Sequence, residues 1–449
     1  MCRIQQGDIL QRPNILFFFP DQWRGDWTGA NPAVPVRTPN LDALNRRGVR
    51  FSKAICPSPL CAPCRAGVAT GLEYDNGPVQ GNDTDLPLDH DTLYRRLQQA
   101  GYWVTGCGKF DLNKKSCTSR QSAWGVDGRR FLPQWGFDDG INNEGKIDGY
   151  SSGLERPQGP YLHYLEEQGL RQAHLDDLAA RRGEPLAAFP TPLPDEVYCD
   201  NWIGENGLTL LQRAPAGRPW FLQVNFTGPH NPWDITRSMT GWYQDVEFPL
   251  SRDMASGSPQ QHQEVRRNYA AMCENIDRWL GRYLYFLQQR GELDNTLICF
   301  SSDHGEMLGD RQRWGKNAPY QPSVGVPLTV AGPDIIAGVH CDLPTTILDL
   351  GATFLEVSGA VPAANWDSRS LWALLTGQTQ SHRAVVRSGL GPWRLVWDGR
   401  HKLIRRQGEE ELYDLDADPA ERDNLALSAA GGRVLANLQK HFVQQPTEE

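Results

Sequence analysis

Apolar positions along the chain follow two periods, and each predicts a different kind of element. Short apolar runs, typical of strands buried on both faces, predict strands at residues 14–19, 102–106, 220–226 and 296–300. Apolar residues three and four positions apart predict helices at residues 91–100 and 265–289. Because strands alternate with helices, we expect an α/β fold: a mostly parallel central sheet sandwiched by helices.

One further helix is predicted from its boundary residues. Thr38 offers a capping hydroxyl, Pro39 suits the first helical turn, and Gly48 ends the helix. The segment lies between the first two predicted strands, as expected for a helix that covers one face of the sheet.

The pattern changes in two later parts of the chain. Residues 116–196 have weaker periodicity and many Gly, Pro and charged residues, so we expect insertions over the active face that select the substrate. After Gly377 come short strand-like segments at 384–387, 393–397, 401–404 and 411–415, a turn at Asp418-Pro419 and a helix at 428–444. We therefore divide the chain into a catalytic domain, 1–377, and a small C-terminal subdomain, 378–449, with an antiparallel sheet and a helix.

Composition limits the partners. The 449 residues carry a net charge of −9, which argues against general affinity for nucleic acid. No run approaches the roughly 20 apolar residues of a membrane span, and residues 1–8 lack the layout of a signal peptide. We expect a cytoplasmic protein without nucleic-acid or membrane partners, and any anionic substrate would need a locally positive pocket.

The most informative motif is Cys61-Ala62-Pro63-Cys64-Arg65, followed by Thr70-Gly71. Cys61 and Cys64 alone could be half of a structural zinc site or a redox pair. A structural zinc site needs a second ligand pair at short spacing, and Cys107 and Cys117 are too far apart to supply it. The surroundings also lack a small thioredoxin-like unit, which argues against the redox pair.

Two predicted strands end in oxygen-rich clusters. Asp21 and Gln22 follow the strand at 14–19, and Ser302-Asp303-His304-Gly305-Glu306 follows the strand at 296–300. Open α/β sheets place their sites at the carboxyl ends of strands. Two such ends can hold one divalent cation between them.

Together these motifs resemble the type I sulfatases and the related phosphonate monoester hydrolases, members of the alkaline-phosphatase-like superfamily. The resemblance spans roughly residues 13–430. The shared motifs, in chain order, are Asp21-Gln22, T-P-N-L-D at 38–42, C-x-P-x-R at 61–65, G-Y-x-x-x-x-x-G-K at 101–109, P-H-x-P at 229–232, S-D-H-G-E at 302–306, Lys316, and E-L-Y-D-L at 411–415.

The resemblance implies a modified nucleophile and a metal ion. Cys61 would be oxidised by a formylglycine-generating maturase to formylglycine, an aldehyde whose hydrate attacks the substrate. One divalent cation would contact this residue. Ca²⁺ is the expected ion, and a histidine ligand widens the choice to Mg²⁺ or Mn²⁺. The implied metal set is Asp21, Gln22, Cys61, Asp303 and His304.

The resemblance also implies roles for cationic residues. Arg65 would hold the hydrate, and Lys109, His230 and Lys316 would surround the sulfate. Either His230 or Lys316 would protonate the leaving alcohol.

Two positions depart from the family pattern. Cys64 stands where most relatives have Ser or Ala, and Asp111 where many have a histidine that contacts the formylglycine hydroxyl. Asp111 could replace that histidine as a base or could orient Lys109. We favour orientation, because a carboxylate close to cations has a lowered pKa and is a poor base.

We therefore expect a hydrolase of small-molecule or carbohydrate sulfate esters. A phosphonate monoester or phosphodiester hydrolase with the same machinery is the alternative. An inactive binding protein on this scaffold is a third hypothesis. Trp23, Trp233 and Trp314 lie beside the motifs and are the candidate aromatic walls of the pocket.

Overall fold

The computed structural model describes residues 12–119, 124–429 and 431–442, and its centre is one large sheet. The predicted strands are its four neighbouring central strands. Parallel pairing joins β5, β4, β6, β1 and β7, whereas β8 is antiparallel to β7 and to β2. In spatial order the strands are β5 (Asp139–Asn142), β4 (Trp103–Gly108), β6 (Trp220–Asn225), β1 (Asn14–Phe18), β7 (Thr296–Ser301), β8 (Leu328–Ala331), β2 (Gly48–Phe51) and β9 (Val339–Cys341).

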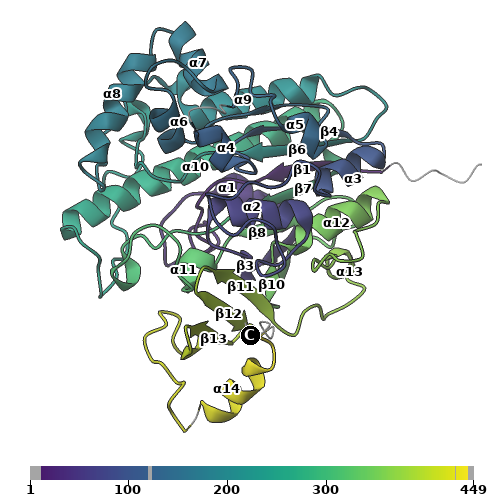
Figure 1. Cartoon of the computed structure of the whole chain (residues 1–449), viewed down its shortest axis with the longest axis vertical. Helices are drawn as coiled ribbons and strands as arrows, with labels where there is room; N and C mark the ends of the chain where they lie inside the picture. The colour runs from purple at the N-terminus through teal and green to yellow at the C-terminus, as the bar shows by residue number, and fades with distance from the viewer. Residues whose placement is uncertain (1–11, 120–123, 430, 443–449) are drawn as a thin grey trace, which may run out of the picture.

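Both faces of this sheet are covered by helices (Figure 1). Side chains of β1 alternate between two hydrophobic clusters: Ile15 and Phe17 pack into one, Leu16 and Phe18 into the other. The first cluster includes side chains of α2 (Cys61–Thr70), α3 (Leu93–Gln99) and α12 (Asp349–Ser358). The second includes α1 (Pro39–Arg47), α9 (Cys199–Gln212) and α10 (Pro259–Gln289). The predicted α/β sandwich is confirmed.

The first turns of α1 and α10 differ from the sequence prediction, and α3 begins at Leu93, two residues after the predicted start. Pro39 does open α1, but the Thr38 hydroxyl accepts a hydrogen bond from the Gly29 amide (2.7 Å) and caps nothing in the helix. The Asp277 carboxylate instead accepts from the amides of Asn40 and Leu41, at 3.1 and 2.7 Å. Helix α10 begins at Pro259, before the predicted residue 265, because Ser258 and Gln261 form a capping box ahead of the apolar stripe.

The segment 116–196 contains several short helices joined by loops. It contains β5, which pairs with β4 as an edge strand of the main sheet, so residues 139–142 belong to the sheet and are not inserted. The sequence of β5 contains a single isoleucine, so its apolar pattern did not predict a strand. The remaining elements are α4 (Lys114–Thr118), α5 (Leu132–Trp135), α6 (Lys146–Ser152), α7 (Pro160–Glu167), α8 (Arg171–Arg182) and the 3₁₀ helix η1 (Asp195–Val197).

The C-terminal part is the predicted small antiparallel sheet with a helix, at the bottom of Figure 1. It consists of β11 (Val386–Leu390), β12 (Trp393–Trp397), β13 (His401–Arg406), β14 (Glu409–Asp414) and α14 (Gly432–Gln439). The helix is shorter than predicted, and the predicted residues after 442 lie outside the described ranges. Trp393, Leu395 and Ile404 pack into the same cluster as Phe17, so this sheet shares a core with the α/β part. The boundary at residue 377 stays a prediction.

Smaller elements complete the chain. They are β3 (Ala54–Ile55), which pairs with β10 (Thr345–Thr346), α11 (Gln321–Val324), α13 (Trp372–Leu375), and the 3₁₀ helices η2 (Arg237–Met239), η3 (Leu293–Asn295) and η4 (Asp310–Gln312). None of the helices in the described ranges is long and apolar enough to cross a bilayer.

Candidate active site

The candidate residues meet at the carboxyl edge of the parallel strands. Asp21 follows β1, Lys109 follows β4, and Asp303 follows β7. These strands are neighbours in one parallel block, so their carboxyl ends lie at the same edge. Helix α2 adds Cys61, its first residue, and the positive end of the helix dipole lies at that residue.

The cationic side chains around position 61 stabilise a negative charge there. The Cys61 Sγ lies 3.3 Å from His304 Nε2, 3.4 Å from Lys109 Nζ and 3.8 Å from Asp21 Oδ1. Burial and Asp21 raise the pKa of the thiol, but the cations Lys109, Lys316 and His304 outweigh them and lower it to about 5. An oxyanion at this position would meet the same stabilisation.

Cys64 lies in the opposite kind of environment. It packs in the hydrophobic cluster on the α2 face of the sheet. Burial, together with a hydrogen bond to Cys56, holds the pKa of the Cys64 thiol well above its usual value. The two cysteines of the C-x-x-C pair therefore differ in chemistry, and only Cys61 faces the charged residues.

Four buried residues could hold a metal ion. One ligand atom each from Asp21, Cys61, Asp303 and His304 lies within 4.8 Å of all the others. His304 Nδ1 is 3.1 Å from the Gly305 carbonyl, and Nε2 is 3.6 Å from one oxygen of each aspartate. If Nδ1 donates to the carbonyl, the Nε2 lone pair faces two carboxylates, an arrangement that needs a proton or a metal ion between them. Burial also raises the pKa of Asp303. Two carboxylates and an imidazole therefore fit a divalent cation.

Gln22 borders this set through its backbone. Its amide donates to Asp303 Oδ1 (3.0 Å), and its φ of 70° turns the chain sharply. The side-chain oxygen accepts from Lys316 Nζ (2.6 Å), and the side-chain nitrogen donates to Glu306. Its place among the metal ligands stays a prediction. Glu306, which anchors its side chain, was not predicted although the S-D-H-G-E motif contains it.

Arg65 donates hydrogen bonds to residues at the carboxyl ends of three strands. Its Nε donates to Asp303 Oδ2 (2.9 Å), and Nη1 donates to the Lys109 carbonyl (2.8 Å) and to Asn225 Oδ1 (3.0 Å). Its guanidinium lies over the Phe19 ring, 4.9 Å from the ring centroid. Nη2 is buried without a hydrogen-bond partner, so one donor remains for a ligand. Asn225 was missed, although it ends β6 and the rule that located Asp21 and Asp303 also points to it.

Asp111 is bound between two lysines. Its Oδ2 lies 3.2 Å from Lys109 Nζ and 3.0 Å from Lys114 Nζ, and Lys109 also pairs with Asp21. Burial raises the pKa of Asp111, but Lys109 and Lys114 outweigh it and hold the pKa well below its usual value. The carboxylate is therefore ionised and a weak base, and it fixes the ammonium group of Lys109.

His230 and Lys316 form a donor pair. His230 Nδ1 is 2.5 Å from the Asn231 carbonyl, and Nε2 is 2.6 Å from Lys316 Nζ. Burial and the neighbouring Lys316 hold the pKa of His230 well below its usual value. The imidazole is then neutral, with Nδ1 donating to the carbonyl and Nε2 accepting from the ammonium. Lys316 is therefore the donor in this hydrogen bond.

The segment that carries Lys316 is held by the C-terminal sheet. Lys402 Nζ donates to the Pro319 carbonyl (3.1 Å) and to Gln321 Oε1 (3.0 Å), while Glu421 Oε2 accepts from the Gln321 amide (2.7 Å). Lys402 and Glu421 are fully buried and paired with each other. Sequence patterns gave no sign of this arrangement, because its partners are far apart in the chain.

A cavity of about 170 Å³, the catalytic cavity, opens beside these groups. Its lining includes Lys109, Lys114, Lys146, Asp148 and His230. The predicted aromatic walls are wrong for this cavity. Trp23 and Trp233 are buried in the core, and Trp314 packs against His262 and donates to the Ser256 carbonyl.

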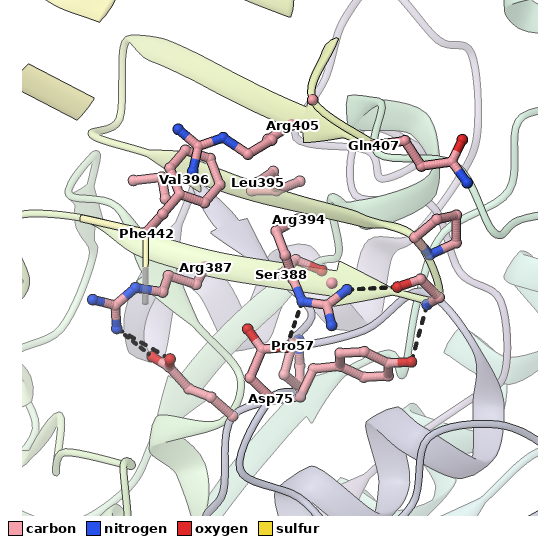
Figure 2. Close-up of a pocket in the computed structure, with 16 residues that line it drawn as sticks. Pro57, Asp75, Arg387, Ser388, Arg394, Leu395, Val396, Arg405, Gln407 and Phe442 are labelled. Atoms are coloured by element: carbon pink, nitrogen blue, oxygen red, sulfur yellow. Dashed lines mark hydrogen bonds and ion pairs between the residues drawn. The ribbon is translucent and has the colours of Figure 1, made fainter. Parts of the chain in front are cut away.

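A larger cavity, about 550 Å³, lies between the C-terminal sheet and the α/β part, and we call it the C-terminal cavity (Figure 2). Its walls include Arg387, paired with Glu73, and Arg394, paired with Asp75. It contains none of the candidate catalytic or metal-binding residues.

Comparison with known proteins identifies the family. The family model described as Sulfatase matches residues 13–360, most of the chain. The chain belongs to the sulfatase family. The prediction of a sulfuric ester hydrolase is thereby confirmed. This sulfatase is 28% identical to a choline-sulfatase of Rhizobium meliloti (strain 1021), over 94% of this chain and 83% of the relative. It is 24% identical to an arylsulfatase of Clostridium perfringens, over 97% and 94%.

Solved structures share the fold of this sulfatase. A phosphonate monoester hydrolase of Agrobacterium radiobacter superposes with a TM-score of 0.79, at 24% identity, covering 96% of this chain and 94% of the other. A protein solved in complex with its substrate D-glucosamine-2-N,6-O-disulfate gives 0.77, at 19% identity, covering 96% of each. These values confirm the alkaline-phosphatase-like architecture.

Proposed function

We propose that this sulfatase hydrolyses sulfate esters through a formylglycine made from Cys61. The observation that carries the proposal is the environment of position 61. Cys61 opens a buried helix, and its Sγ lies within 3.4 Å of both Lys109 and His304. The formylglycine hydrate would supply the nucleophilic oxygen, in the place that the thiol sulfur occupies in the unmodified chain. Conversion requires a formylglycine-generating maturase.

Asp21, Asp303 and His304, with the group at position 61, would hold one divalent cation, and Gln22 is the candidate further ligand. Ca²⁺ suits the oxygen donors, and Mg²⁺ or Mn²⁺ are the alternatives that His304 permits. When bound, the ion supplies Lewis-acid stabilisation and lowers the pKa of the attacking hydroxyl.

Two cations would orient the nucleophile and the sulfate. The free Nη2 of Arg65 lies 3.8 Å from Asp21 Oδ2, on the side of the metal set. Lys109 lies against Sγ, and Asp111 fixes its ammonium group. Positive charge held in place in this way stabilises the charge that grows on sulfate oxygens in the transition state.

Lys316 would protonate the alcohol oxygen as its bond to sulfur breaks. Neutral His230 accepts a hydrogen bond from Lys316, which directs the ammonium group, and the lysine would regain its proton from water. Asp111 is proposed as a positioning residue for Lys109 and not as the base that releases sulfate.

The test uses the matured enzyme and three esters of one alcohol: a sulfate, a phosphonate monoester and a phosphodiester. We expect the sulfate ester to have the highest kcat/KM. A higher value for the phosphonate or the phosphodiester would favour the alternative hydrolase, and absence of turnover on all three would favour the binding-protein reading.

Metal dependence is tested on the same enzyme. Chelation should abolish turnover, and Asp303→Asn should lower the metal content measured by elemental analysis. Full activity of the metal-free enzyme would contradict the proposed role of the cation.

A further inference from the structure

We propose that Lys402 and Glu421 are positioning residues for Lys316, and that through this lysine they set the rate at which the leaving alcohol is protonated. The inference rests on the proposed function, in which Lys316 is the proton donor, and adds to that reaction two residues from the C-terminal part of the chain. Residues 315–321, which include Lys316, are called the donor segment.

The ammonium group of Lys316 has weak partners of its own. Its Nζ lies 2.6 Å from Gln22 Oε1 and 2.6 Å from His230 Nε2. The first is a neutral amide, and burial together with Lys316 keeps the pKa of His230 low and its imidazole neutral. Lys109, in contrast, pairs with two carboxylates. Hydrogen bonds to neutral groups are weaker than those to carboxylates, so the place of the Lys316 ammonium group depends on where its backbone lies.

The backbone beyond Lys316 is held by the pair Lys402 and Glu421. Lys402, on β13, donates from Nζ to the Pro319 carbonyl (3.1 Å) and to Gln321 Oε1 (3.0 Å), and it also pairs with Glu421. Glu421 Oε2 accepts from the Gln321 amide (2.7 Å). These contacts occupy all three N–H donors of the ammonium group, so Lys402 has none left for a ligand and its role is to hold the donor segment.

The backbone on either side of Lys316 is also fixed. The Gly315 amide donates to Glu306 Oε1 (2.6 Å), within the cluster that follows β7. Trp393 Nε1, on β12, donates to the Asn317 carbonyl (3.3 Å). The residue before Lys316 is therefore attached to the metal-site cluster, and the residue after it to the C-terminal sheet.

A second set of contacts joins the turn at Glu421 to the donor segment. Arg311 Nη1 donates to the carbonyls of Ala420 and Glu421. Its guanidinium lies over the Tyr320 ring, 3.8 Å from the ring centroid. The Tyr320 hydroxyl donates to Glu411 Oε2 (3.1 Å), on β14. The donor segment and the turn therefore move together.

Stability alone does not account for the pair. The side chains of Lys402 and Glu421 are fully buried, and burial lowers the pKa of Lys402 while Glu421 opposes that shift. Apolar side chains of similar volume often stabilise a fold as well as a buried ion pair does. Glu421 also has a φ of 56°, in the left-handed region that favours glycine. A charged, strained residue at this point is explained by the directed hydrogen bonds that it makes to the donor segment.

The first experiment compares kcat of the matured enzyme on an alkyl sulfate and on 4-nitrophenyl sulfate. The variant is the double substitution Lys402→Met with Glu421→Gln, which leaves no unpaired charge in the core. We expect kcat to fall roughly 10- to 100-fold on the alkyl ester, because a displaced donor protonates the alkoxide poorly. On the nitrophenyl ester it should fall by about twofold at most, because nitrophenolate leaves without a proton. An equal fall on both esters would overturn the inference.

The matched control is Arg383→Met with Asp349→Asn. This ion pair is also buried and joins the C-terminal part to α12, away from the donor segment. The control should keep the wild-type ratio of the two kcat values, and a changed ratio there would contradict the assignment. Trp393→Phe keeps an aromatic ring but removes the donor to Asn317, so it should change the ratio in the same direction as the double variant. If the double variant fails to fold, an unchanged ratio in Trp393→Phe overturns the inference.

A thermodynamic cycle tests whether the two residues act through Lys316. Lys316→Met alone should lower kcat on the alkyl ester at least as much as the double variant does. Combining all three substitutions should cause no further loss, because the donor to be positioned is already absent. A further tenfold loss in the combined variant would show that Lys402 and Glu421 act by another route.

A measurement without turnover separates this inference from the proposed function. In the unmatured protein labelled with ¹⁵N-histidine, the Nε2 signal of His230, assigned with His230→Gln, reports the hydrogen bond from Lys316. The double variant should move this signal in the same direction as Lys316→Met, and the control should not. That result supports the positioning role even if no sulfate ester is hydrolysed. An unmoved signal overturns it even if sulfate esters are hydrolysed.

Discussion

The two cavities are both lined by cations, but they arrange them differently. In the C-terminal cavity each arginine has its own acid: Arg387 pairs with Glu73, Arg394 with Asp75, and Arg405 with Glu410. Beside the catalytic cavity, the acids around Lys109 are shared. Asp111 lies between Lys109 and Lys114, and Asp21 between Lys109 and Arg65.

The one-to-one pairs indicate a structural role for the C-terminal cavity, and the shared acids indicate a site for chemistry. Two of the one-to-one pairs join the C-terminal sheet to the α/β part and are partly exposed. Shared acids leave cations with free donors around a common point, and that point is where a sulfate can bind. The larger cavity is therefore not the better candidate site, because convergence of charge is more informative than volume.

The largest effect is expected at Cys61, the proposed nucleophile beside the catalytic cavity. Cys61→Ser should lower kcat by roughly 10⁴-fold or more, because a serine hydroxyl cannot form the hydrate. Cys64→Ser is the matched control, one helical turn away and outside the charged group. Mass spectrometry of the peptide ending at Arg65 should place the aldehyde at position 61. An aldehyde at position 64, or an inactive Cys64→Ser enzyme that is still modified at 61, would remove the distinction between the two cysteines.

A smaller effect is expected at the shared acid. Asp111→Asn should slow the first step by roughly 10²-fold, because Lys109 loses the group that fixes it. The pKa of Asp111 is well below its usual value, so this carboxylate is ionised at neutral pH. It should therefore contribute no limb to the pH–kcat profile between pH 5 and 9. Stopped-flow measurement of alcohol release should show no burst. A burst followed by a stalled enzyme would identify Asp111 as a base for sulfate release.

The smallest effect is expected in the C-terminal cavity. Arg394→Gln should lower the free energy of unfolding by at most about 1 kcal/mol, because its ion pair with Asp75 is partly exposed. Denaturant unfolding gives this value, and kcat/KM on a sulfate ester should stay unchanged. Asp75→Asn should behave in the same way. A tenfold loss of activity in either variant would mean that the C-terminal cavity belongs to the active site.

Sequence patterns predicted the features that depend on neighbouring residues. The apolar runs located β1, β4, β6 and β7, and these strands form the centre of the sheet. The strand-end rule then pointed to Asp21 and Asp303, and the structure brings both beside Cys61. The same rule, applied to β6, would have given Asn225.

Features that join distant segments were not predictable. The N-terminal cap of α1 is supplied by Asp277, on a helix more than two hundred residues later, so a local search selected Thr38 instead. The tryptophans beside the motifs suggested pocket walls, but Trp23 and Trp233 are buried in the core and Trp314 packs against His262. Lys114 and Lys146 gave no signal either, since single lysines are common on surfaces and only the fold brings them into one cavity.

The bond between Lys402 and the segment around Pro319 has a consequence for the order of events at the ribosome. Lys316 belongs to the proposed catalytic group, yet its segment is anchored by residues that are synthesised some eighty to one hundred positions later. An emerging chain contains the proposed nucleophile and the proposed acidic ligands before it contains the residues that anchor the segment of the proposed proton donor. Activity is therefore expected to appear only when the last strands fold, and a product truncated before residue 402 should be catalytically silent even where its main sheet is formed.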